Sequence, residues 1–128
     1  MQPRNAPEGR QQASDAAADE IVTIRVEGSK LEYETTRIEL EAGTTVTIRL
    51  DNSASSMPHN LVLLKNRDDV QTVGIAALQA YKTDYVPESE ADKIVAHTPL
   101  ARPGDVVEVT FVVPPPGEYT YICTYPGH

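Results

Sequence analysis

The chain has 128 residues, of which 40% are hydrophobic and 23% charged, and its formal net charge is −8. This length suits one globular domain with its own core, and no apolar run approaches the ~20 residues of a membrane-spanning helix. The acidic balance excludes the basic surface that is typical of nucleic-acid binding, so we expect no nucleic-acid partner.

The first nineteen residues differ in composition from the rest of the chain. They are rich in Gln, Pro, Ala, Asn and Asp, and they contain no aromatic and no β-branched side chain. Such a segment buries too little apolar surface to offset its ordering entropy. We therefore interpret residues 1–19 as a disordered tail or linker, or as a cloning remnant, and we place the folded domain at residues 20–128.

Short segments in which apolar and polar residues alternate dominate the rest of the chain. This period of two is typical of half-buried β-strands, and it occurs at residues 22–26, 38–40, 46–50, 107–113 and 119–123. Residues 61–64 are continuously apolar, which predicts a strand covered on both faces. Turn signals lie between these segments, among them a polar loop at residues 51–56. The pattern predicts an all-β sandwich or barrel.

Residues 68–82 break the β pattern. Their apolar side chains recur at helical spacing, at Val70, Val73, Ile75, Ala77, Leu78 and Tyr81. Asp68 is the predicted N-cap, with Gln71 three residues later as its capping-box partner. We expect one short amphipathic helix, inserted between strands.

Three residues with metal-binding side chains lie beside proline-containing turns. Cys123, the only cysteine, is separated from His128 by a Pro-Gly loop, and His59 follows Pro58 far upstream. Taken alone, a cysteine is most often a small buried hydrophobic residue, and a histidine is most often structural. Together, one thiolate and two imidazoles form the His2Cys set that suits copper in electron-transfer proteins.

The segments around these ligands resemble the cupredoxins, which are blue-copper proteins, and in particular the azurin and auracyanin type. The resemblance lies in residues 57–63 (MPHNLVL) and residues 119–128 (YTYICTYPGH), and it extends over residues 20–128. Residues 95–98, the turn at residues 103–105 and the inserted helix are also similar. The resemblance implies a Greek-key β-sandwich with one short helix and a copper centre at one end.

The resemblance also implies a ligand set for one copper ion that cycles between Cu(I) and Cu(II). His59, Cys123 and His128 would be the equatorial ligands, and the backbone carbonyl of Pro58 would be a weak axial contact. Family members usually carry an axial methionine shortly after the second histidine. Because this chain ends at His128, we expect the natural chain to continue with that methionine and a closing C-terminal strand.

Residues next to the ligands would complete the centre. The resemblance implies that Asn60 ties the two ligand loops together near the sulfur, with Thr124 and Pro126 also beside the ligands. Pro126 has no N–H and so cannot donate a hydrogen bond to the sulfur. His97 matches a position that is not a ligand, so we interpret it as a solvated histidine. Tyr119 follows a turn and would form a tyrosine corner.

The implied function is one-electron transfer by a monomer, without enzymatic activity, between redox proteins such as a cytochrome or a membrane electron-transfer complex. Met57 and Tyr125 would form an apolar docking patch for the partner. The family implies a periplasmic or extracytoplasmic location, with membrane anchoring only through sequence outside this chain. Three alternatives stay open: a copper domain of a larger oxidase or reductase, a copper storage or delivery protein, and a zinc site.

Overall fold

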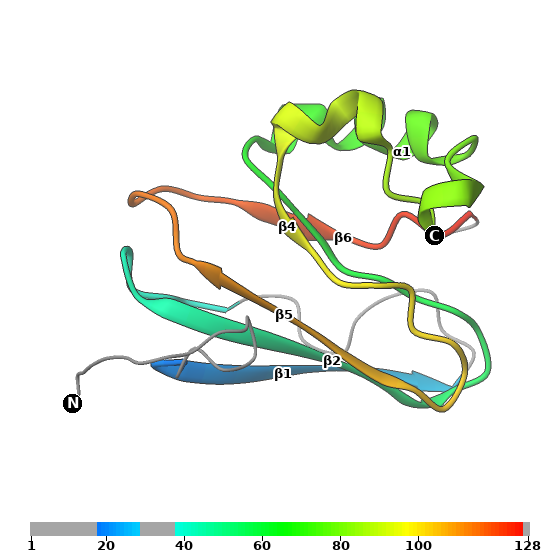
Figure 1. Cartoon of the computed structure of the whole chain (residues 1–128), viewed down its shortest axis with the longest axis horizontal. Helices are drawn as coiled ribbons and strands as arrows, with labels where there is room; N and C mark the ends of the chain where they lie inside the picture. Colours follow the sequence, from blue (N-terminus) through cyan, green and yellow to red (C-terminus); the bar gives the residue numbers. More distant parts are fainter. Residues whose placement is uncertain (1–17, 29–37, 127–128) are drawn as a thin grey trace.

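The computed structural model describes residues 18–28 and 38–126. Within these residues the chain forms two three-stranded β-sheets, which lie over one another as layers (Figure 1). The first sheet has the order β1-β2-β5, with β1 at Glu20–Gly28, β2 at Thr45–Ser55 and β5 at Val106–Val112. The second has the order β4-β3-β6, with β4 at Ile94–His97, β3 at Val62–Leu64 and β6 at Thr120–Ile122.

Strand β2 is the centre of the first sheet. It runs parallel to β1 and antiparallel to β5, with an irregularity in β1 between Arg25 and Glu27. Asp19 joins this sheet through two hydrogen bonds, because its N–H donates to the carbonyl of Thr45 (2.7 Å) and its carboxylate accepts from the N–H of Thr45 (2.9 Å). The earlier residues of the predicted tail, 1–17, lie outside the described part of the chain.

The main core lies between the two sheets. The alternating residues of the first sheet place one set of side chains against the second sheet, and the fully buried ones are Ile24, Val26, Val46, Ile48 and Leu50. Burying one such side chain contributes roughly 1.5–3 kcal/mol to folding. The strands predicted at residues 22–26, 46–50 and 107–113 are therefore present, and their apolar positions are the ones that face the core.

A second core cluster lies on the outer face of the second sheet. Helix α1 (Val70–Ala77) and the short 3-10 helices at Arg67–Asp69, Tyr81–Thr83 and Glu88–Lys93 cover this face (Figure 1). Val73 and Val86 pack there against Val62 and Leu64 of β3. Because core also lies on its other face, β3 is buried on both sides, as its continuous apolar sequence predicts.

The helix differs from its prediction at both ends. It stops at Ala77 instead of residue 82, and Tyr81 belongs to a separate 3-10 turn. The N-cap of α1 is Asp69 and not Asp68, and its side chain makes no capping hydrogen bond. The side chain of Asn66 instead caps the preceding 3-10 helix, where it accepts from the N–H of Asp68 (2.9 Å). Ile75 is 61% exposed. A helix of two turns contacts the sheet along a narrow stripe, so the wider apolar pattern does not correspond to burial.

Three further segments depart from the sequence interpretation. Residues 38–40 form no strand, although Ile38 and Leu40 pack against the main core. Strand β2 continues through Ser55, where a polar loop was expected, because its end pairs with the end of β1, with Ser55 opposite Gly28. Strand β4 was not predicted. For β2 and β4, pairing with a distant segment decided the backbone conformation, whereas residues 38–40 join no strand pair.

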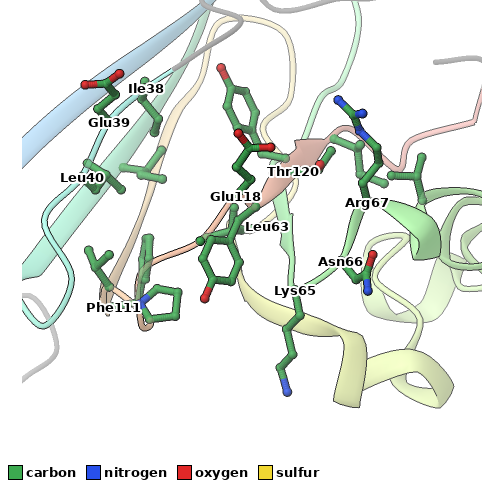
Figure 2. A pocket seen from close by; sticks show the side chains of 18 of the residues that line it. Ile38, Glu39, Leu40, Leu63, Lys65, Asn66, Arg67, Phe111, Glu118 and Thr120 are labelled. Carbon is green, nitrogen blue, oxygen red and sulfur yellow. The ribbon is translucent and has the colours of Figure 1, made fainter.

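A cleft of about 1560 Å³ opens between the sheets, and its lining includes His59 and Cys123. Figure 2 shows Leu40 and Phe111 on one side of it and Leu63 and Thr120 on the other. Among the described residues, β6 pairs with β3 along one edge and with no strand along the other. The closing strand expected after His128 stays a prediction.

No helix in the described ranges has the length and apolar content that crossing a membrane requires.

Candidate metal centre

Two of the predicted ligands come from neighbouring strands. His59 lies just before β3 and Cys123 lies just after β6, and these strands are antiparallel with Val62 opposite Ile122. The start of β3 and the end of β6 therefore meet at the same end of the sheet. His59 Nδ1 lies 3.8 Å from Cys123 Sγ, although the two residues are 64 positions apart.

His59 is held by backbone pairing and by a buried amide. Its N–H donates to the carbonyl of Ala101 (3.0 Å), and its carbonyl accepts from the N–H of Ala101 (2.8 Å). The side-chain NH2 of Asn52 donates to the carbonyls of Met57 (2.9 Å), Arg102 (3.0 Å) and Ala101 (3.2 Å). Asn52 thus joins the loop before His59 to the segment that pairs with it. Sequence reasoning missed this residue, because an asparagine in a polar stretch indicates a turn.

We expect the substitution Asn52→Leu to loosen this end of the sandwich. Asn52 is fully buried, and leucine has a similar size but no donor for the three carbonyls. The free energy of unfolding of the metal-free protein should fall by about 1–3 kcal/mol in urea denaturation. The control Ser56→Ala, at an exposed position nearby, should stay within about 0.5 kcal/mol of the wild type. Equal stability of both variants would contradict this role.

Asn60 connects the two ligand-bearing segments. Its side-chain oxygen accepts from the N–H of Thr124 (2.8 Å), and its NH2 donates to Thr124 Oγ1 (2.9 Å). Its own N–H points at Cys123 Sγ (3.5 Å). Asn60 is fully buried and Thr124 is 4% exposed. The residue after His59 and the residue after Cys123 are thereby joined by hydrogen bonds shielded from water.

The thiol of Cys123 lies in a desolvated but polar setting. Burial raises the pKa of Cys123, and the backbone N–H groups of Asn60 and Tyr125 partly offset this rise. The metal-free protein therefore holds a neutral thiol at neutral pH, and metal binding must displace its proton, which favours uptake at higher pH. Sequence reasoning noted that Pro126 cannot donate to the sulfur and missed the N–H of Tyr125.

The remaining predicted site residues lie around this pair or outside the described part. Pro58 directly precedes His59, and Pro58, Met57, Tyr125 and Pro126 are all half-buried. His128 is among the residues that the structure does not describe. Residues 18–28 and 38–126 accordingly contain no group of three His, Cys, Asp or Glu side chains able to hold a metal ion.

Two residues with expected structural roles lie apart from this pair. The exposed side chain of His97 has its Nδ1 3.0 Å from the carbonyl of Thr98, in keeping with a solvated histidine. The hydroxyl of Tyr119 donates to the carbonyl of Pro115 (2.7 Å), which is the contact of a tyrosine corner.

The separation of His59 and Cys123 suits shared coordination of one metal ion. Bonds of about 2.0–2.1 Å to nitrogen and about 2.3 Å to sulfur, at the 120° angle of a trigonal site, place the two ligand atoms ~3.8 Å apart. The observed distance is 3.8 Å. A soft thiolate with imidazole nitrogen is also the donor combination that selects copper or zinc over magnesium or calcium.

A two-layer β-sandwich with a cysteine and a histidine converging at one end defines a class of small metal-binding β proteins. Residues 20–128 match the family model of copper-binding proteins of the plastocyanin/azurin family. The chain belongs to this family, and within it to the cupredoxins of the azurin and auracyanin type.

Two relatives and one solved structure show the extent of the similarity. Auracyanin-A of Chloroflexus aurantiacus is 38% identical over 84% of this chain and 68% of its own length. Auracyanin-B of the same organism is 34% identical over 99% of this chain, which spans only 54% of that relative. The solved structure of auracyanin A, described as a "blue" copper protein, matches with a TM-score of 0.76 and 35% identity, covering 84% of this chain and 88% of that one.

These findings confirm the resemblance and the all-β fold with one short helix. They also make copper, one ion per domain, the cofactor of the family to which the chain belongs.

Proposed function

We propose that this domain is a mononuclear blue-copper electron-transfer protein in which His59, Cys123 and His128 hold the metal. The observation that supports it best is the 3.8 Å approach of His59 Nδ1 to Cys123 Sγ at the end of a cupredoxin sandwich. When bound, copper supplies a one-electron couple between Cu(I) and Cu(II). The backbone carbonyl of Pro58 is the proposed weak axial contact.

The protein contributes to this function by holding the ligand atoms of His59 and Cys123 in fixed positions. His59 is 1% exposed and is paired with Ala101, while the sulfur of Cys123 faces the N–H of Asn60. Ligands on such rigid segments reorganise little when a metal changes its oxidation state. The hydrogen bonds between Asn60 and Thr124 hold the two ligand-bearing segments in register.

We further propose that the domain works as a monomeric electron carrier and not as an enzyme. Its partners would be redox proteins such as a cytochrome or a membrane electron-transfer complex, in a periplasmic or extracytoplasmic location. Met57 and Tyr125 are half-buried beside the ligands, which suits a small docking patch of the kind used in transient redox encounters. Any membrane anchor would lie in sequence outside this chain.

Titration of the metal-free protein with Cu(II) tests the function. We expect an intense thiolate-to-copper absorption band that saturates at one equivalent, bleaches on reduction and returns on reoxidation. Zn(II) serves as the competitor, since a His2Cys set with a fourth ligand also suits zinc. Tight colourless zinc binding without a copper band, or a copper band that does not survive a redox cycle, would contradict electron transfer.

A further inference from the structure

A turn with unusual backbone conformation lies beside the proposed centre. Asp84 and Tyr85 follow the 3-10 helix Tyr81–Thr83, and both have positive φ, 55° and 67°. Among the described residues they are the only non-glycine residues with positive φ. A positive φ is sterically unfavourable for any residue with a Cβ, and a bulky tyrosine in this conformation is a true outlier. Strain of this kind persists only where surrounding contacts hold it.

The carbonyl groups of this turn point at the ligand-bearing segments. The carbonyl of Asp84 accepts from the side-chain NH2 of Asn60 (3.3 Å), and the carbonyl of Tyr85 accepts from Thr124 Oγ1. The ring of Tyr85 meets the ring of Tyr125 edge-on, with centroids 5.2 Å apart and an angle of 78° between the planes. Thr124 and Tyr125 are the two residues directly after Cys123, so the turn contacts both.

The turn is itself anchored in the second core cluster. The N–H of Tyr85 donates to the carbonyl of Ala80 (2.8 Å), and Thr83 Oγ1 donates to the carbonyl of Val86 (2.7 Å). Val86 is 7% exposed and packs with Val62 and Leu64 of β3. A continuous set of contacts therefore runs from the sheet, through the turn, to the Cys123 segment. The side chain of Asp84 is exposed, so the turn acts through its backbone and one ring.

We propose that the Asp84–Tyr85 turn is a positioning element that fixes the segment after Cys123 before metal binds. The inference rests on the proposed function, because it assumes that Cys123 is a ligand. In the metal-free protein, the carbonyl and ring of Tyr85 limit the motion of Thr124 and Tyr125, and the carbonyl of Asp84 holds the side chain of Asn60. The sulfur then stays at the distance from His59 that coordination needs, and the excursion between β3 and β4 is part of the metal centre.

Two pairs of variants test this role. Thr124→Val removes the hydroxyl that donates to the carbonyl of Tyr85 and accepts from Asn60, and Thr124→Ser keeps it. Tyr85→Ala removes the ring that meets Tyr125, and Tyr81→Ala removes a 64% exposed tyrosine four positions earlier as a matched control. Backbone amide exchange in the metal-free protein reports the Thr124 N–H, and the amide of Ile48 in β2 reports global unfolding. Copper affinity and the energy of the thiolate-to-copper band are measured on the loaded protein.

We expect Thr124→Val and Tyr85→Ala to speed exchange of the residue-124 amide at least tenfold, without an equal change at Ile48. Copper affinity should fall about tenfold, the lower end of the effect of losing an outer-shell partner, and the band should shift. Thr124→Ser and Tyr81→Ala should match the wild type. Wild-type exchange at residue 124 in both altered variants, or a rise equal to that at Ile48, would overturn the proposal. The exchange result holds even if copper does not bind, which separates it from failure of the proposed function.

Discussion

Replacing Cys123 by serine is expected to abolish the visible thiolate-to-copper band completely. The sulfur is the only soft anionic donor in the chain, which has a single cysteine. A serine hydroxyl neither ionises near neutral pH nor gives sulfur-to-copper charge transfer. Copper affinity should fall by more than the 10–100-fold that loss of an outer-shell partner costs. Absorption spectroscopy with a competition titration measures both effects.

The fold of the Cys123→Ser protein should survive, which separates loss of the ligand from loss of structure. Cys123 is half-buried, and serine is nearly isosteric with it. Circular dichroism and thermal unfolding of the metal-free variant should therefore resemble those of the metal-free wild type. A variant that keeps the coloured band with a native fold would exclude Cys123 as the ligand.

Replacing His59 or His128 by glycine is expected to give variants that respond differently to added imidazole. His128→Gly should lose the band and regain it when imidazole is added, because His128 is carried on a short Pro-Gly loop. His59→Gly should lose the band and recover it far less, because the side chain of His59 is 1% exposed. Visible titration of both copper-loaded variants with imidazole gives the comparison.

The free energy of unfolding of the His59→Gly and His128→Gly variants provides a second comparison. His59→Gly leaves a cavity at a buried position and should lower the free energy of unfolding by about 2–5 kcal/mol. His128→Gly should change it much less. A third variant, His97→Gly at the exposed histidine, should keep both the band and the stability. Recovery by imidazole at His59 together with failure at His128 would reverse the assignment of the buried and the accessible ligand.

Local patterns predicted those parts of the fold in which one face of a strand is buried. Residues 46–50 and 107–113 alternate because β2 and β5 each present one side to the core. Residues 61–64 are continuously apolar because β3 is covered on both sides. The candidate ligands could also be named from the sequence, since cysteine and histidine are rare and their side chains carry the metal chemistry.

The same patterns failed where the conformation of a segment depended on the element packed or paired against it. Residues 68–82 suggested one short helix through residue 82, but only Val73 and Ala77 of α1 are buried and the helix ends at Ala77. Residues 38–40 alternate and pack against the core without joining a ladder. Apolar periodicity indicates which side chains face inward, and it does not indicate whether the backbone has a hydrogen-bonding neighbour.

By itself, the sequence determined the strand-rich character of the domain, its apolar faces and the residue types able to bind copper. Only the tertiary structure decided that His59 lies 3.8 Å from Cys123, that Asn52 holds the preceding loop, and that the turn at Asp84 and Tyr85 reaches Thr124. The physical reason is that many of these contacts are made by backbone carbonyls. Every residue has such a group, so its partner follows from the path of the chain in space and leaves no mark on the identity of the residue.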